Sequence, residues 1–226
     1  ADPSVASILF DVDSPGGTVT GVQELADEIY SARGIKPMTA LCNGLMASAA
    51  YWLASQADEI VTIPSGHAGS IGVFTAHQDM SEAMAKEGIK TTLISAGKHK
   101  LAGHPFAPLS AEEEAVMQGR VDAMYATFVK TVARGRGVSP ADVRGGFGEG
   151  RTLMGADAKA AGLVDRVSTV AEAVDRVSRG RVHMRADAVP MVVVAEALAD
   201  VVAEVPREAL LPSTAVRVDM RRGRVL

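Results

Sequence analysis

The stretch Leu41–Asp58, LCNGLMASAAYWLASQAD, joins a short apolar strand to a helix through the dipeptide Asn43-Gly44. Ser48 falls in the first turn of that helix, with small residues on both sides. A helix start presents free N–H groups that stabilise negative charge, and small neighbours let a substrate backbone approach. The position suits a nucleophilic serine. It also suits a serine that only caps the helix.

On both sides of this stretch, short apolar runs alternate with segments of helical periodicity, and glycines follow the runs. This alternation predicts an α/β fold with β-α-β units around a mostly parallel sheet, and such sheets place their sites at the strand ends. We expect strands over residues 5–12, 38–42, 59–63, 70–75, 91–95 and 163–167, and helices over 22–33, 48–56, 80–86, 110–134 and 154–161.

The composition bounds the class of protein. With 226 residues, 47% of them hydrophobic, the chain can bury a substantial core, and a net charge of −4 gives no general case for nucleic-acid binding. The lone Cys42 excludes an internal disulfide, and its place in an apolar strand indicates a buried small hydrophobe. No apolar run reaches the length of a membrane span.

The chain changes character after Arg179. We expect a main domain over residues 1–179 and an appendage over 180–226, which holds an alanine-valine helix candidate at 192–202 and a basic end. The first strand begins almost at once after Pro3, so we also expect that an N-terminal element of the domain is missing.

A nucleophilic serine needs a base. No acidic partner lies at a recognisable spacing from His67, His77, His99 or His104, and a surface or loop position explains each of these four histidines. The other candidates are Lys98 and Lys100 in the polar loop 96–109. A lysine acts as a base only when neutral, which requires its pKa to fall from about 10.4 toward about 7–8, whereas loop lysines are normally solvated and charged. Residues two apart share a face in an extended segment, so spacing does not separate the two lysines.

Four sequence blocks together resemble the signal-peptide-peptidase A family of serine proteases, in the family's order and at closely similar spacing over about residues 5–167. The blocks are Asp13-Ser14-Pro15-Gly16-Gly17, Ala47-Ser48-Ala49-Ala50-Tyr51, Gly69-Ser70-Ile71-Gly72-Val73 and Gly97-Lys98-His99-Lys100. The resemblance implies a Clp/crotonase-like fold and a serine endopeptidase that uses a Ser-Lys dyad without metal or cofactor.

The resemblance also implies roles for individual residues. Ser48 matches the nucleophile, Lys100 the general base, and Ser70 the serine that hydrogen-bonds the lysine. The glycine turn at Gly16 and Gly17 matches the oxyanion site, with the backbone N–H groups of Gly17 and Ala49 as its donors. In this family adjacent protomers or tandem domains contribute the serine and the lysine of one site, so a single-copy chain is expected to form a homo-oligomer.

The chain departs from the cellular enzymes of the family, because Ala49-Ala50 stands where they usually carry Gly-Gly, and we also expect no counterpart of their membrane anchor. Both features resemble the branch of tailed phages and prophages, similar to the minor capsid proteases of lambda-type phages, as does the segment 97–109. The implied substrates are scaffold, portal or capsid polypeptides, and the implied location is the bacterial host cytoplasm or the procapsid. The alternatives are a cellular protease that degrades membrane-derived peptides, and a non-catalytic capsid-assembly protein.

Two related enzyme classes share the broad fold. A Clp-type protease, by family resemblance, needs a histidine about 25 residues after the serine, where this chain has Ile71-Gly72-Val73. A crotonase would carry an acyl-CoA site and would leave Ser48, Ser70 and Lys100 unexplained. We therefore expect neither.

Overall fold

A computed structural model describes residues 2, 4–180, 215–219 and 224–225, and shows a mixed α/β chain that divides into two units. Unit 1 comprises residues 1–72 and 128–226, and unit 2 comprises residues 73–127. Each unit is described by itself below. No helix among the described residues is long and apolar enough to cross a membrane.

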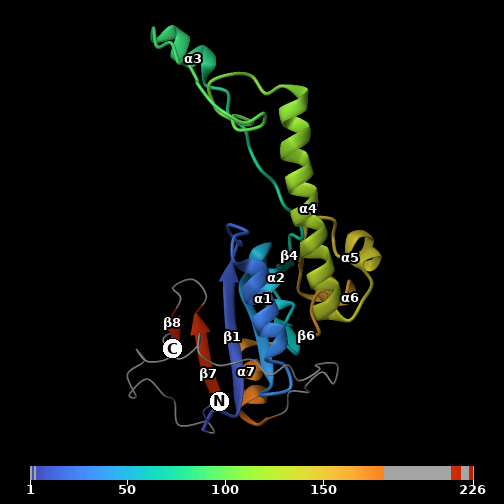
Figure 1. The fold of residues 1–226 in the computed structure, drawn as a ribbon. Helices are drawn as coiled ribbons and strands as arrows, with labels where there is room; N and C mark the ends of the chain where they lie inside the picture. Colours follow the sequence, from blue (N-terminus) through green and yellow to red (C-terminus); the bar gives the residue numbers. More distant parts are fainter. Residues whose placement is uncertain (1, 3, 181–214, 220–223, 226) are drawn as a thin grey trace. The chain divides into compact units, whose positions relative to one another are not determined.

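The core of unit 1 is a mostly parallel sheet (Figure 1), as the alternating pattern predicts. At its centre β2 (Met38–Ala47) pairs with β1 (Ser7–Ser14) on one edge. On the other edge β2 pairs first with β3 (Glu59–Thr62) and then with β4 (His67–Gly69). The remaining strands extend the sheet: β6 (Arg166–Val167) pairs with β3, β5 (Thr152–Met154) with β4, β7 (Ala215–Asp219) with β1, and β8 (Arg224–Val225) with β7. The pairings of β5 and β8 are antiparallel.

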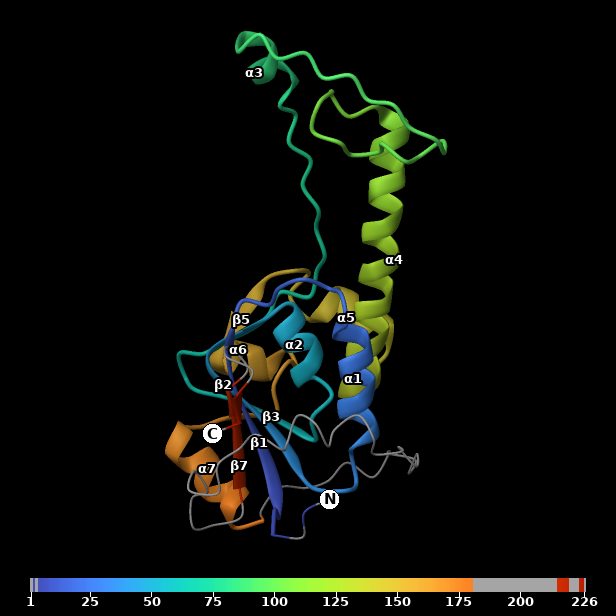
Figure 2. The same cartoon turned by 60° about the vertical axis from the view of Figure 1, so that its left-hand side comes forward.

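Helices cover both faces of this sheet. Figure 2 shows α7 (Val170–Ser178) on one side and α1 (Val22–Ser31) with α2 (Ala49–Ala54) on the other. Ala173 and Val177 of α7 pack against apolar side chains of three neighbouring strands, Leu9, Leu41 and Val61. On the opposite side Trp52 of α2 stacks on Phe128 of α4 (Ala111–Arg136), with 4.3 Å between the ring centroids. The short helices α5 (Pro140–Gly146) and α6 (Gly155–Ala160) complete unit 1.

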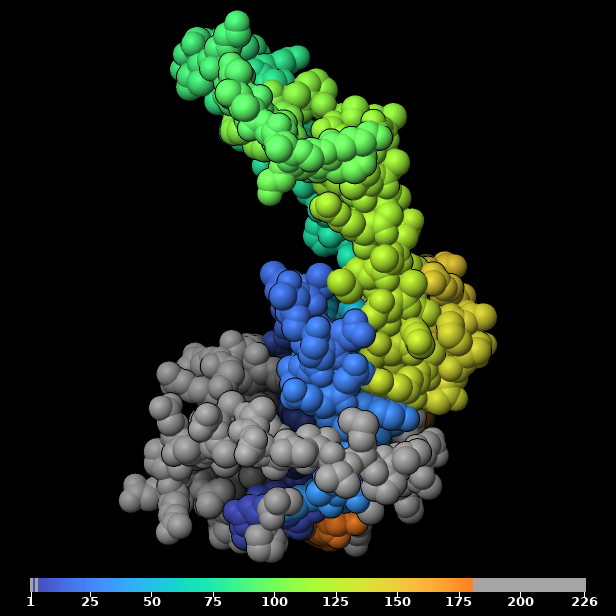
Figure 3. Space-filling view, viewed as in Figure 1, coloured from blue at the N-terminus to red at the C-terminus, as the bar shows by residue number. Residues whose placement is uncertain are grey.

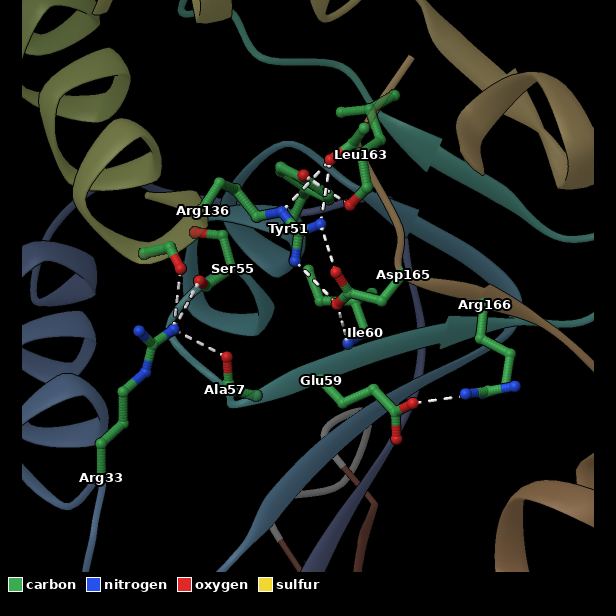
Figure 4. Close-up of polar contacts among 12 residues, drawn as sticks. Arg33, Tyr51, Ser55, Ala57, Glu59, Ile60, Arg136, Leu163, Asp165 and Arg166 are labelled. Carbon is green, nitrogen blue, oxygen red and sulfur yellow. Dashed lines mark hydrogen bonds and ion pairs between the residues drawn. The ribbon is translucent and has the colours of Figure 1, made fainter. Parts of the chain in front are cut away.

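Buried polar contacts hold the far end of α2 in place (Figure 4). The guanidinium of Arg33, which is 3% exposed, donates to the carbonyls of Ser55, Gln56 and Ala57 after α2, and to that of Gly135 in α4. The hydroxyl of Tyr51 donates to the Leu163 carbonyl at 2.8 Å. Unpaired backbone carbonyls would be costly in this interior, so these donors make the end of α2 a rigid part of the core.

Unit 2 has no core of its own. None of the residues 73–127, all of which the structure describes, is buried. The unit, green in Figure 3, contains α3 (Ser81–Lys86) and the first part of α4, which begins after a capping box between Ser110 and Glu113. Its exposed large apolar side chains include Phe74 and Ile94, which are 90% and 94% exposed.

The structure confirms most of the predicted elements and corrects two. The segments 70–75 and 91–95 are not strands. The strand near the first lies earlier, at His67–Gly69, and ends where Gly69 and Ser70 both take a positive φ. Residues 91–95 have strand-like composition, but a strand also needs a neighbour to receive its backbone hydrogen bonds, and unit 2 provides none among its described residues. The helix expected at 192–202 lies outside the described residues.

Candidate active site

Ser48 stands at the junction of β2 and α2 in a strained conformation. Its φ of 53° and ψ of −124° are values that non-glycine residues rarely adopt. The backbone N–H of Ser48 donates to the Gly69 carbonyl at 2.9 Å, and its carbonyl accepts from the Trp52 N–H at 2.9 Å. Such strain costs about 1–3 kcal/mol and persists where the surroundings enforce it, which is typical of functional positions. A sharp strand-to-helix turn of this kind presents a serine hydroxyl at the edge of a sheet.

The glycine turn after β1 lies directly against Ser48. A Cβ atom on Gly16 would come within 2.7 Å of the Ser48 Cβ and 2.9 Å of the Ala49 backbone nitrogen, and the φ of Gly16 is 100°. Only glycine fits there without a shift of the backbone. At the next residue, Gly17, a Cβ would meet no atom within 4 Å. The turn and the first residue of α2 thus border one small region beside Ser48.

Asp13, which the sequence reasoning did not single out, sets the register of this turn. Val12 pairs with Cys42 but Ser14 pairs with Met46, so two steps along β1 match four along β2. The Asp13 carboxylate accepts the Leu45 N–H at 3.1 Å inside this irregularity, and a Cβ on Gly44 would lie 3.0 Å from it. The sequence signals were the position of Asp13 at the end of an apolar strand before a turn and its place at the head of the first family-like block.

Ser70 is linked to Ser48 through its own neighbour, Gly69. The carbonyl of Gly69 accepts the Ser48 N–H, and the N–H of Ser70 donates to the Arg151 carbonyl at 2.8 Å. Ser70 has a φ of 55° and is partly buried. Unit 1 therefore brings together Ser48, Ser70 and the glycine turn, although these residues come from separate strand ends.

The two candidate lysines belong to unit 2. Lys100 is exposed, and its backbone N–H donates to the Gly97 carbonyl at 3.1 Å. Lys98 forms an ion pair with Glu112 at 2.7 Å, with both side chains largely exposed. Unit 1 thus holds every predicted site residue except Lys100.

The remaining nucleophile and base candidates have structural explanations. Cys42 is fully buried, its thiol donates to the His67 carbonyl at 3.3 Å, and burial raises the pKa of this thiol. These facts match the expected buried hydrophobe and oppose a thiolate nucleophile. In unit 2 a ring nitrogen of His77 contacts the His104 carbonyl at 2.9 Å. Across the described residues, no group of three or more His, Cys, Asp or Glu side chains is arranged to hold a metal ion.

Comparison with known proteins places this chain in a family. Residues 31–183 match peptidase family S49. The capsid assembly protease C of Escherichia phage lambda is 37% identical over 174 residues, which are 77% of this chain and 39% of that protein. The head-tail preconnector protein of Enterobacteria phage P21 is 36% identical over 200 residues, 88% of this chain and 40% of that protein.

Relatives outside phages are also similar. A putative protease of Methanocaldococcus jannaschii is 37% identical over 178 residues, 79% of this chain and 57% of that protein. This chain therefore spans between two fifths and three fifths of the length of these three relatives.

Proposed function

Because the chain belongs to peptidase family S49, we propose that it is a serine endopeptidase in which Ser48 is the nucleophile. The observation that carries the proposal is the conformation of Ser48, which is strained at a strand-to-helix junction and packed against Gly16. A serine that only capped α2 would have an ordinary extended φ and a side-chain bond to the helix, and Ser48 has neither in the described contacts.

In the proposed reaction, neutral Lys100 takes the hydroxyl proton of Ser48 as its oxygen attacks a peptide carbonyl. The backbone N–H groups of Gly17 and Ala49 stabilise the oxyanion. Protonated Lys100 then gives its proton to the leaving amine as the C–N bond breaks, and an acyl-enzyme forms. Water then releases the acyl group. Ser70 hydrogen-bonds the lysine and orients it. The packing of Gly16, the neighbour of Gly17 in the turn, against Ser48 and the Ala49 backbone nitrogen supports this division of roles.

Lys100 is a better candidate for the base than Lys98. The ammonium of Lys98 is already paired with the carboxylate of Glu112, 2.7 Å away within unit 2. A base must be neutral, and no ion pair of Lys100 is found within the part of the chain that the structure describes. A rate that rises with pH is therefore expected, and a rate independent of pH from about 6 to 9 would count against a lysine base.

We further propose that a second copy of the chain completes the site. Unit 2 buries none of its residues and exposes large apolar side chains, a surface that soluble proteins normally cover. A homo-oligomer would bury this surface and could bring Lys100 of one copy to Ser48 of the next. None of the described contacts of Ser48 is with a lysine of unit 1.

The similarity to family S49 and to its phage members also supports a proposal about fold family, biological role and location. We propose a Clp/crotonase-like fold, and a role in phage or prophage head maturation with scaffold, portal or capsid polypeptides as substrates, in the host cytoplasm or the procapsid. The capsid assembly protease and the head-tail preconnector protein support this context by name. We also propose that residues 1–179 form the peptidase domain and that residues 180–226 are appended to it.

The test compares cleavage of a labelled unfolded protein by the parent and by Ser48→Ala, Lys100→Ala and the matched control Lys98→Ala. Both Ser48→Ala and Lys100→Ala should lose cleavage while staying folded, and Lys98→Ala should retain it. Mixing the two inactive variants should restore part of the activity if the dyad is shared between copies. Parent-like cleavage by Ser48→Ala would exclude this site.

A further inference from the structure

A third residue with a strained backbone lies in the turn 148–151, which contacts Ser70 through the Arg151 carbonyl. Among the described residues, three that are not glycine have a positive φ: Ser48 at 53°, Ser70 at 55° and Glu149 at 51°. Each such conformation has an energetic cost, and such residues cluster at functional sites because the strain is part of how the site is held. Nothing in the proposed mechanism accounts for Glu149.

Hydrogen bonds lead from Ser48, by way of Gly69 and Ser70, to the turn that contains Glu149. Ser48 donates its N–H to the carbonyl of Gly69, and the next residue, Ser70, donates its N–H to the carbonyl of Arg151. Arg151 then closes a tight turn around Glu149, because its backbone N–H and its Nε both donate to the Gly148 carbonyl at 3.0 Å. The path therefore runs from the nucleophile to the turn 148–151.

The carbonyl of Arg151 is closely surrounded. A Cβ atom on Gly69 would lie 2.8 Å from this oxygen, and a Cβ on Gly148 would lie 3.2 Å from it. Glycine at both positions lets the two backbones approach, so the oxygen sits between the turn and the Gly69-Ser70 peptide. A change in the shape of the turn would move the acceptor of the Ser70 N–H directly.

The side chain of Arg151 acts mainly on its own turn. It is 74% exposed, and its contact with the exposed Glu149 carboxylate is long, at 3.8 Å. An exposed ion pair of this kind contributes little to stability. The bond from Nε to the Gly148 carbonyl remains, and it holds together a turn in which both central residues, Glu149 and Gly150, have a positive φ.

We infer that the turn 148–151 is a positioning element of the peptidase site, and that Arg151 is a positioning residue that holds Ser70, and through Gly69 also Ser48, in the reactive conformation. The inference rests on the proposed function, because it assigns Ser70 to the site. It predicts that the side chain of Arg151 affects turnover more than substrate binding or the stability of the fold.

The experiment uses Arg151→Met, Glu149→Gly, the double variant and the matched control Arg179→Met, which removes an exposed arginine paired with Asp175 on α7. For each, kcat and KM on a labelled unfolded protein, the rate of Ser48 labelling by a fluorophosphonate, and the thermal midpoint are measured. Arg151→Met should lower kcat and the labelling rate by about tenfold to a hundredfold, with KM and the midpoint unchanged. Arg179→Met should match the parent.

The double variant separates positioning from other roles. Glycine adopts the φ of residue 149 without strain, so Glu149→Gly should restore most of the turnover lost in Arg151→Met. A rise in KM that Glu149→Gly does not reverse would mean that Arg151 contacts the substrate. A loss of folding that Glu149→Gly does not reverse would mean that Arg151 stabilises the fold. Either result overturns the inference, as does parent-like kcat in Arg151→Met. Cleavage by Ser48→Ala in the same assay would instead overturn the proposed function.

Discussion

At the scale of single residues, the candidate site depends on positions where only one residue type fits the space or the backbone angle. Gly16 is held against Ser48, and Gly69 against the carbonyl of Arg151. Sequence patterns identified the glycines as turn residues, but the contacts that require them come from other strands. Adding even a methyl side chain at either glycine should therefore lower activity strongly.

We expect Gly16→Ala to lower kcat/KM by about a hundredfold, because its Cβ would lie 2.7 Å from the Cβ of Ser48 and displace it. Alanine is also strained at the φ of 100° that Gly16 adopts, so the variant should have a free energy of unfolding lower by about 1–3 kcal/mol. Urea unfolding and turnover of an unfolded substrate measure both effects. Gly145→Ala is the control, since a Cβ there meets nothing within 4 Å. Parent-like turnover in Gly16→Ala would contradict the described packing.

At the scale of elements, the helix that follows Ser48 is short and is held by its neighbours. Just after α2, the Gln56 carbonyl accepts a hydrogen bond from the Arg33 guanidinium. The Gln56 side-chain amide donates to the Thr131 carbonyl of α4. A helix of this length is not stable alone, so tertiary contacts set its position. The close contact between α2 and α4 occurs at Gly135, where a Cβ would overlap the Ser55 carbonyl.

Gly135→Ala should therefore destabilise the chain by about 1–3 kcal/mol, because α4 would have to move away from the end of α2. The same change at Gly119 of α4, where a Cβ meets nothing within 4 Å, should be neutral or stabilising by up to about 1 kcal/mol. Urea unfolding of the two variants makes the comparison. Equal effects at both positions would show that α4 and α2 are not in close contact.

The capping box of α7 predicts a dependence of stability on pH. Hydrogen bonds from the backbone N–H and the hydroxyl of Thr169 lower the pKa of Glu172. A lowered pKa in the folded state adds stability above the unfolded pKa, about 4.3, and this stability is lost as pH falls through the folded pKa. Glu172→Ala should thus be less stable than the parent at pH 7, and the difference should shrink below about pH 4.

Urea unfolding midpoints from pH 3 to pH 7 check this expectation. The matched control is Glu114→Ala, because Glu114 is an exposed carboxylate in the first turn of α4 and is not the capping residue there. A difference between parent and Glu172→Ala that persisted unchanged at pH 3 would mean that the box does not depend on the ionised carboxylate.

At the scale of the whole molecule, the two units differ in how much they bury. Unit 1 contains the core and all proposed site residues except Lys100, whereas residues 73–127 bury nothing among themselves. Because an uncovered apolar surface is unfavourable in water, the proposed oligomer would stabilise unit 2 and complete the site together. Assembly and activity should then depend on the same residues.

Ile94→Lys should lower both the assembly state and the specific activity, because the side chain at 94 is 94% exposed and would have to be buried in the oligomer as a charge. Analytical ultracentrifugation and cleavage assays over a range of protein concentration measure the two effects. Ile35→Lys, at a 60% exposed position in unit 1, is the control. A monomeric Ile94→Lys with full activity would contradict a site shared between copies.

Much of the local structure follows from the sequence alone. The strand that leads into Ser48, the helices α1, α4 and α6, and the mostly parallel sheet were predicted because hydrophobic periodicity and turn residues are local signals. The strands expected at 70–75 and 91–95 were wrong, because a strand depends on a partner that lies elsewhere. The antiparallel strand β5 was missed for the same reason.

The sequence by itself therefore determined the fold class, the family and the candidate residues Ser48, Ser70 and Lys100, because short, contiguous sequence patterns are enough to predict each of them. Only the tertiary structure decided that Gly16 packs on Ser48, that Asp13 sets the register beside it, and that a path of hydrogen bonds connects Ser48 to Arg151. These contacts join residues far apart in the chain, and their geometry depends on how the strands pair. Periodicity along the chain carries no information about that pairing.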